Sequence, residues 1–311
     1  MKASQLADRF GLTGPARLSE PVARGKQGLV RRLETTEGSW AVKVPFEPVE
    51  EQEVAASTAF QEAAHAAGVP TPAVRRTTEG AVLADVDGHR VRLYSWVDVG
   101  PPDATLDPVL VGTAVASLHQ VRGPEGSAPL DAWYCDPVGA EQWDALVSDL
   151  RREGAPFAER FAELRDDLVA LEGWLEPPGT LQCCHRDLWA DNLLPTVDGG
   201  VCVLDWENSG DADPHQELGV VLFEFARGDA GRARALTDAY RDAGGPARVT
   251  RRGHFSMLVA QLGHITEIGA RDWLVPNHRS PTRADAEAWV RETLDDPHTP
   301  VVLDDLLVAV R

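Results

Sequence analysis

The residues best suited to chemistry lie in one stretch of the chain, residues 185–205. The stretch begins His-Arg-Asp-Leu-Trp-Ala-Asp-Asn and ends at an aspartate that follows a short apolar run. The side-chain oxygens of Asn192 and Asp205 are ligands of the kind that Mg²⁺ prefers, and Mg²⁺ usually takes its other ligands from water and phosphate groups. A further carboxylate, that of Asp187, is suited to orient a hydroxyl group for attack. The stretch therefore has the residue types of a phosphoryl-transfer site.

The spacing within this stretch predicts a β-hairpin. Two short apolar runs flank the Asp-Gly pair at residues 198–199, and a tight hairpin turn needs residues that accept a positive φ. With that pair as the loop, Leu193 faces Leu204, and the next pair outward is Asn192 with Asp205. The predicted hairpin brings the amide and the carboxylate side by side. The alternative is a surface hairpin in which the acidic residues have no common role.

The pattern His-x-Asp-x-x-x-x-Asn, followed by a strand-end aspartate, resembles the catalytic and metal-binding loops of the protein-kinase-like superfamily. The details resemble its small-molecule branch, the aminoglycoside phosphotransferase and choline kinase family. Asp205-Trp206-Glu207 stands where protein kinases have Asp-Phe-Gly, and no Ala-Pro-Glu segment follows. Arg186 departs from the glycine that is commonest in that branch. The resemblance implies that Asp187 is catalytic, that Asn192 and Asp205 hold Mg²⁺, and that ATP or GTP is the co-substrate.

Composition and charge limit the class of protein. A length of 311 residues favours two lobes or domains, and 43% hydrophobic with 25% charged residues is ordinary for a globular protein. The net charge of −19 argues against nucleic acid or an anionic membrane as a partner and permits attraction of a cationic substrate, although an acidic, solvated surface explains it equally well. The four cysteines form no C-x-x-C pair, and there is no signal sequence or 18-residue apolar stretch, so a cytoplasmic protein is expected.

The amino-terminal part, residues 1–97, is predicted to form a nucleotide-binding lobe built on a five-stranded antiparallel sheet. Strands are expected at residues 17–22, 29–35, 39–45, 81–84 and 91–94. In the third strand, alternation places Val42 and Val44 on one face and Ala41 and Lys43 on the other. The chain has three lysines, at positions 2, 26 and 43, so a lysine inside an apolar strand suggests a specific role.

The resemblance gives this lobe further expected nucleotide contacts. Ala41-Val42-Lys43 resembles the family's A-x-K strand, whose lysine holds the α- and β-phosphates; an edge-strand lysine facing water is the alternative. Gly25 and Gly28 stand in the loop that the family folds over the phosphates. The segment that contains Ser95 and Val97 corresponds to the hinge, where an adenine would bind to the main chain.

A helix is predicted at residues 47–67, where the family places a glutamate that pairs with the strand lysine. The expected position falls near Ser57 or Thr58, neither of which is acidic. Glu53, about one turn earlier, is the preferred partner of Lys43. Glu62, about one turn later, is left open as an alternative, and both can also be ordinary solvated helix positions.

The remaining residues, 98–311, are predicted to form a mainly helical lobe that holds the catalytic loop and the acceptor pocket. Helices are expected at residues 107–122, 141–153, 156–174, 216–227, 231–243, 251–268, 283–294 and 304–310. With the sheet lobe, they make an α+β, bilobal, protein-kinase-like fold.

The predicted function is that of a small-molecule kinase. It transfers the γ-phosphate of ATP or GTP to a hydroxyl of a polar, cationic acceptor such as an aminoglycoside or peptide antibiotic. A metabolic kinase of the same fold, acting on choline, homoserine, thiamine or a ketosamine, is one alternative, and a nucleotide-binding pseudokinase is another. Partners are limited to nucleotide and acceptor, with no nucleic acid or membrane, and the protein is expected to be a monomer or a homodimer.

Overall fold

The structure, a computed structural model, describes residues 1–24, 28–49, 51–123, 128–277, 280 and 282–311, without the side chains of residues 52 and 53. The chain divides into two compact units. The first consists of Met1–Leu106, Ala114–Ala128 and Gln182–Asp211, and the second of Asp107–Thr113, Pro129–Leu181 and Ala212–Arg311. The first unit therefore unites the amino-terminal sheet with the whole of residues 185–205. The lobe boundary near residue 97 stays a prediction.

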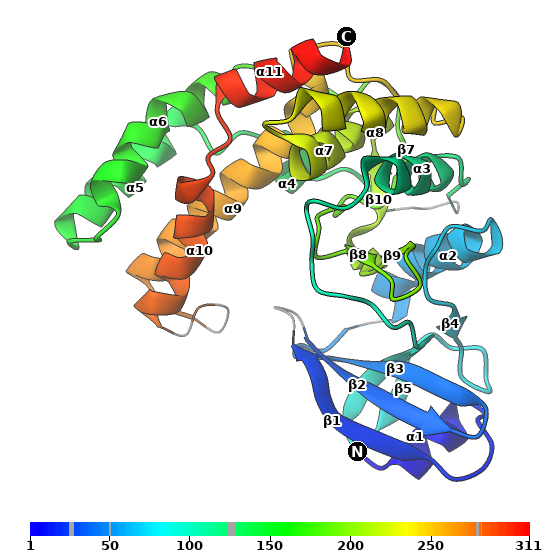
Figure 1. The fold of residues 1–311 in the computed structure, drawn as a ribbon. Coiled ribbons are helices and arrows are strands. Elements are labelled where there is room, and N and C mark those ends of the chain that lie inside the picture. The colour runs from blue at the N-terminus through cyan, green and yellow to red at the C-terminus, as the bar shows by residue number, and fades with distance from the viewer. Residues whose placement is uncertain (25–27, 50, 124–127, 278–279, 281) are drawn as a thin grey trace. The chain divides into compact units, whose positions relative to one another are not determined.

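The first unit is built on an antiparallel sheet of six strands (Figure 1). These are β1 (Arg17–Arg24), β2 (Gly28–Thr35), β3 (Gly38–Pro45), β4 (Val74–Arg75), β5 (Ala84–Val86) and β6 (His89–Ser95). Their order is β1-β2-β3-β6-β4, and β5 pairs with β6 beside this path. The predicted sheet had one strand fewer, because a two-residue strand such as β4 is too short to show alternation.

The alternation predicted for the third strand is confirmed. Strands β2 and β3 pair in unbroken register from Gly28 with Pro45 to Thr35 with Gly38. On one face, Val42 and Val44 join a buried cluster with Leu33 and Leu93 of the sheet. The helix α1 (Ala3–Arg9) covers this cluster with Leu6, and Phe10 follows it in the same core. Lys43 is left on the opposite face, where a site can form.

The helix predicted at residues 47–67 forms as α2 (Glu51–Ala66), which ends where Gly68 adopts a φ of 88°. Its buried side includes Ser57, Thr58 and Phe60. Much later in the chain come β7 (Gln182–Cys184), β8 (Leu193–Pro195), β9 (Val201–Val203), the 3-10 turn η1 (Trp206–Asn208) and β10 (Gly210–Ala212). The helix α3 (Pro108–His119) and β10 each belong partly to both units.

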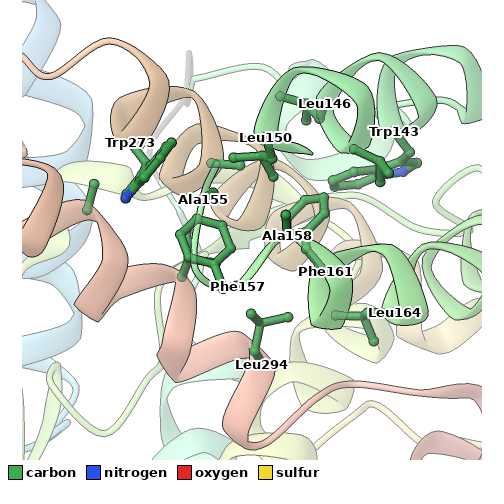
Figure 2. Close-up of a cluster of buried hydrophobic side chains, with 14 of the residues drawn as sticks. Trp143, Leu146, Leu150, Ala155, Phe157, Ala158, Phe161, Leu164, Trp273 and Leu294 are labelled. Atoms are coloured by element: carbon green, nitrogen blue, oxygen red, sulfur yellow. The ribbon is translucent and has the colours of Figure 1, made fainter. Parts of the chain in front are cut away.

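The second unit is helical. It contains α4 (Ala132–Cys135), α5 (Ala140–Arg152), α6 (Ala158–Glu172), α7 (Pro214–Ala226), α8 (Ala230–Asp242), the 3-10 turn η2 (Arg252–Phe255), α9 (Ser256–Leu274), α10 (Arg283–Asp295) and α11 (Pro300–Val310). Large side chains from α5, α6, α9 and α10 form one buried cluster, which includes Trp143, Phe161, Trp273 and Leu294 (Figure 2). This cluster supplies the apolar burial that stabilises the unit.

The predicted helices of this unit are present with shifted ends. The last helix begins at Pro300 because Thr299 caps it, its side chain accepting a hydrogen bond from the main chain of Val302. Helix α4 was not predicted, since four residues are too few for a helical periodicity. All four cysteines are free thiols. None of the helices in the described ranges combines the length and apolarity needed to cross a bilayer.

Candidate functional site

The hairpin in residues 185–205 forms, but in a different register from the predicted one. Leu193 pairs with Val203 rather than with Leu204. The loop is longer than the Asp-Gly pair and runs from Thr196 to Gly200, closed by main-chain and side-chain hydrogen bonds of 3.0 Å between its two ends. Asn192 therefore stands next to Leu204, whose main-chain N–H donates to the main-chain oxygen of Asn192 at 2.8 Å. The predicted hairpin pairing of Asn192 with Asp205 is wrong.

Asp205 reaches the site by leaving the strand. It follows β9 and adopts a left-handed backbone conformation with a φ of 57°, after which η1 begins. Aspartate tolerates this conformation better than most residues do. The turn directs the carboxylate toward the sheet, where Lys43 Nζ donates to Asp205 Oδ1 at 2.6 Å.

Lys43 also contacts a second carboxylate from the same turn. Its Nζ atom lies 2.5 Å from Glu207 Oε1, and Arg92 Nη2 approaches the same oxygen at 2.5 Å. Arg92 lies in β6 directly opposite Lys43 in β3, so both cations project from the same face of the sheet. Two cations and two carboxylates thus form one compact network within the first unit.

The charges of this network follow from its contacts. Burial works against the charge of Lys43, but Glu207 and Asp205 outweigh it and raise the pKa of Lys43 to about 12. Burial likewise opposes ionisation of Glu207, yet Lys43 and Arg92 hold its pKa well below the usual range. The pKa of Asp205 is raised, first by burial and then by the neighbouring Glu207. Glu207 therefore carries the firm negative charge of the network.

The carboxylate of Asp187 is held by two amides. Asn192 Nδ2 donates to Asp187 Oδ2 at 2.8 Å and to the Asp187 main-chain oxygen at 2.9 Å. Asn208 Nδ2 donates to the same Oδ2 at 3.0 Å. Burial raises the pKa of Asp187, while the two amides favour its charged form and limit the rise. Asp187 is therefore fixed in orientation by two amides that donate to the same carboxylate oxygen, Oδ2.

The residue before Asp187 explains how the loop bends. Arg186 is buried and has a φ of 65°, a conformation that glycine adopts without cost. Its guanidinium Nε donates to the main-chain oxygen of Asn208 at 2.6 Å. Arg186 lacks the conformational freedom of a glycine, but its side chain links the loop that contains Asp187 directly to η1.

An aromatic cluster supports the turn that carries Asp205. The His185 ring packs edge-on against Trp206 at 4.9 Å between ring centroids, and its Nε2 lies 2.9 Å from the Leu204 main-chain oxygen. Trp206 contacts Phe60 of α2 at 5.4 Å and donates from Nε1 to Thr71 Oγ1 at 2.9 Å. These contacts fix the position of η1 against α2.

The helix glutamate predicted to pair with Lys43 is not established. The side chain of Glu53 lies outside the described residues. Glu62 pairs instead with Arg76, whose Nε and Nη2 donate to its two carboxylate oxygens at 2.7 and 2.8 Å, so the alternative of a Lys43–Glu62 pair is wrong. Among the described side chains, the carboxylates that contact Lys43 belong to Asp205 and Glu207.

The other predicted nucleotide contacts differ in what surrounds them. Gly25 lies outside the described residues. Gly28 begins β2, where a Cβ atom would stand 2.5 Å from the Val44 main-chain oxygen, so packing of the hairpin by itself requires a glycine. Ser95 ends β6, and its Oγ accepts from the Ala73 main chain at 2.9 Å. Val97 follows in an irregular segment after β6. Their contacts with nucleotide stay predictions.

Three residues of the site were not predicted in these roles: Glu207, Arg92 and Asn208. The Asp-Trp-Glu sequence is the signal for Glu207, because it stands two residues beyond Asp205. Arg92 has no comparable signal, because its approach to Lys43 depends on the register between β3 and β6. Asn208 depends on the 3-10 turn that points its side chain back to Asp187.

Comparison with known proteins identifies the family of the chain. A profile of the phosphotransferase enzyme family matches residues 19–254. The structure is similar to that of the spectinomycin phosphotransferase APH(9)-Ia in complex with ADP and spectinomycin, with a TM-score of 0.70, 12% identity and coverage of 99% of this chain and 97% of that chain. No curated protein matches the chain.

Two further solved structures are similar to this chain over most of its length. An aminoglycoside phosphotransferase from Alicyclobacillus acidocaldarius has a TM-score of 0.63 and 16% identity, covering 94% of this chain and 92% of its own. A choline/ethanolamine kinase family protein from Mesorhizobium loti has a TM-score of 0.51 and 22% identity, covering 96% and 93%. These similarities confirm the α+β, kinase-like fold. With its profile match across more than half of its length, the chain belongs to the phosphotransferase enzyme family.

Proposed function

We propose that this protein is a small-molecule kinase that transfers the γ-phosphate of ATP or GTP to a hydroxyl group of a polar, cationic acceptor. The observation that carries the proposal is the presence in one compact unit of two contacting pairs, Lys43 with Asp205 and Asn192 with Asp187. Phosphoryl transfer depends on positioning and charge neutralisation more than on covalent chemistry. A fixed carboxylate, an amide and a charged lysine are suited to that task.

The donor set fits Mg²⁺. The amide nitrogen of Asn192 is engaged by Asp187, so its amide oxygen is the end that remains to face a cation. Asp205 contributes a carboxylate that already attracts positive charge, because Lys43 forms an ion pair with it. Asn192 and Asp205 would hold the ion, and the ion when bound would neutralise charge on the β- and γ-phosphates.

The roles of the protein groups follow from their surroundings. Lys43, which carries a firm positive charge, would turn from the two carboxylates toward the α- and β-phosphates. Asp187 would accept a hydrogen bond from the acceptor hydroxyl, orient it toward the γ-phosphorus, and receive its proton as the new O–P bond forms and the bond to the leaving diphosphate breaks. The raised pKa of Asp187 makes its carboxylate a better proton acceptor.

An aminoglycoside or peptide antibiotic is the acceptor that we propose first. Similar structures include a spectinomycin phosphotransferase and an amicoumacin kinase, and a net charge of −19 favours a cationic ligand. A metabolic kinase acting on choline, homoserine, thiamine or a ketosamine is the second candidate, since an aminopropanol kinase and a putative fructosamine-3-kinase are also similar in structure. We further propose a cytoplasmic monomer or homodimer that binds neither nucleic acid nor membrane.

The experiment that tests the proposal measures ADP or GDP release from Mg-ATP and Mg-GTP across a panel of aminoglycosides, peptide antibiotics, choline, homoserine, thiamine and ketosamines. The Asp187→Asn variant is the blank, because asparagine keeps the size of the side chain and loses the proton acceptor. We expect it to fold, to bind nucleotide and to lose about 10²–10⁴-fold in turnover.

Two results would contradict the proposal. Turnover by Asp187→Asn within tenfold of wild type would remove Asp187 from the catalytic role. Tight binding of Mg-ATP by the wild type, with no product from any acceptor in the panel, would instead favour a pseudokinase.

A further inference from the structure

Arg92 is a buried cation placed opposite the lysine of the site. The two residues are direct partners across β3 and β6, and Arg92 is 4% exposed. Like charges directly opposite each other on one face of a sheet repel. A buried guanidinium is costly unless a carboxylate or other acceptors pair with it. The presence of Arg92 at this position therefore needs a compensating group.

Glu207 is that group. A single oxygen, Oε1, lies 2.5 Å from Lys43 Nζ and 2.5 Å from Arg92 Nη2. The Glu207 side chain is only 15% exposed, so water contributes little to the solvation of its charge. Glu207 thus neutralises both cations and connects the sheet to the turn that begins at Asp205.

Nucleotide binding would change the contacts of Glu207. Under the proposed function, the Lys43 ammonium group moves away from at least one of the two carboxylates that it contacts, in order to reach the phosphate groups. Without Arg92, this movement would leave Glu207 as a buried carboxylate with no cation, which opposes nucleotide binding. With Arg92 in place, Glu207 keeps a partner throughout.

We propose that Arg92 is a positioning residue that keeps Glu207 paired and in place while Lys43 turns to the nucleotide. The inference rests on the proposed function for the role of Lys43. Helix α2 has no acid at the two positions where the family's glutamate is expected, because these are the buried Ser57 and Thr58. The described carboxylates that hold Lys43 come from the segment after β9, and Arg92 holds one of them from the sheet.

The test compares nucleotide binding by wild type, Arg92→Met, Arg92→Gln and Arg92→Lys. The probe is ATP, titrated calorimetrically with Mg²⁺ and again with EDTA, in the absence of an acceptor. The two neutral variants are expected to bind Mg-ATP about tenfold more weakly. The loss is expected to be larger in EDTA, because Mg²⁺ at Asp205 would add positive charge near Glu207 and partly replace the charge of Arg92. Arg92→Lys should recover most of the affinity, because it restores the charge.

The matched control is Arg75→Met in the neighbouring strand β4. Arg75 is another arginine of this sheet and is half-buried, but it donates to the main-chain oxygens of Phe10 and Gly11 at 3.1 and 3.3 Å. Its loss should lower the melting temperature and leave the dissociation constant of Mg-ATP within twofold of wild type. Circular dichroism at the titration temperature establishes that each variant is folded. If Arg92→Met does not fold, Arg92→Gln decides, since its side chain is polar and also lacks the positive charge.

The inference is overturned if a folded neutral variant of Arg92 binds ATP within twofold of wild type in both conditions. An equal loss in Arg75→Met overturns it as well, because that loss would reflect a general weakening of the sheet. A wild type that binds Mg-ATP but phosphorylates no acceptor contradicts the proposed function and leaves this comparison valid. A wild type that binds no nucleotide contradicts both.

Discussion

Lys43 Nζ lies 2.6 Å from Asp205 Oδ1, although 162 residues separate the two in the chain. One partner comes from the middle of a sheet and the other from a left-handed turn after a short strand. Each is held by further contacts of its own, so the pair does not depend on a flexible loop. Under the proposed function, nucleotide phosphates would replace the carboxylate as the partner of Lys43, and Mg²⁺ would replace the lysine as the partner of Asp205.

The first prediction concerns Lys43 itself. Lys43→Met should weaken Mg-ATP binding by about tenfold or more, because one positive charge facing the phosphates is lost. Glu207 retains Arg92, so the variant should fold. Calorimetric titration with Mg-ATP measures the effect, and Lys43→Arg, which keeps the charge, is the matched control. Unchanged affinity in the methionine variant would show that Lys43 is not a phosphate ligand.

The second prediction concerns the backbone at Arg186. Its φ of 65° strains any residue with a Cβ atom, whereas glycine adopts it freely. Both Arg186→Ala and Arg186→Gly lose the link to Asn208, but the glycine variant should be more stable than the alanine variant by about 1 kcal/mol. Urea denaturation of the two variants measures the difference directly. An alanine variant of equal or greater stability would show that the left-handed conformation is not retained.

The third prediction concerns Glu172 in the helical unit. One of its oxygens accepts hydrogen bonds from the main chains of Val138 and Gly139 at 3.0 and 3.1 Å and from Trp143 Nε1 at 2.8 Å. Glu172→Ala should cost about 1–3 kcal/mol of unfolding free energy, because three donors lose their acceptor.

Glu172→Gln, which keeps an acceptor oxygen, is the control and should lose less. Thermal and urea unfolding measure both variants. Mg-ATP binding below the melting transition should match that of wild type, since these contacts lie in the second unit. A wild-type stability for Glu172→Ala would contradict the prediction.

The fourth prediction concerns the pH dependence of stability. His298 is 2% exposed, and burial, with a smaller contribution from Arg227, lowers its pKa from 6.5 to about 4. The unfolded chain therefore binds a proton at this histidine that the folded chain resists between about pH 6.5 and pH 4. Stability from the neutral histidine is present above pH 6.5 and is lost as the pH falls, by about 3 kcal/mol in total.

A His298→Leu variant removes the titrating group. Its unfolding free energy should fall less than that of wild type when the pH is lowered from about 7 to about 4.5. Parallel urea titrations at the two pH values, taken as a difference between variant and wild type, remove the contribution of the many carboxylates. Equal losses in both proteins would mean that His298 is not buried as a neutral ring.

Much of this protein is determined by local sequence. Residues 185–205 contain the acid, the amide and the second acid at a spacing that indicates phosphoryl transfer. The alternation around Lys43 places it opposite a buried face, and most helices follow from their apolar periodicity. These features depend on neighbours within a few residues, because side-chain direction in strands and helices repeats with a fixed period.

Only the tertiary structure decided how these groups meet. The hairpin register depends on a loop closed between Thr196 and Gly200, and it differs from the one that Asp-Gly favours. Arg92 reaches Lys43 because β6 pairs with β3 in one register among several. Glu207, rather than Glu62, contacts Lys43 because a left-handed residue turns the chain toward the sheet. Register, turn conformation and charge compensation are set by distant contacts, so residue type and spacing alone do not specify them.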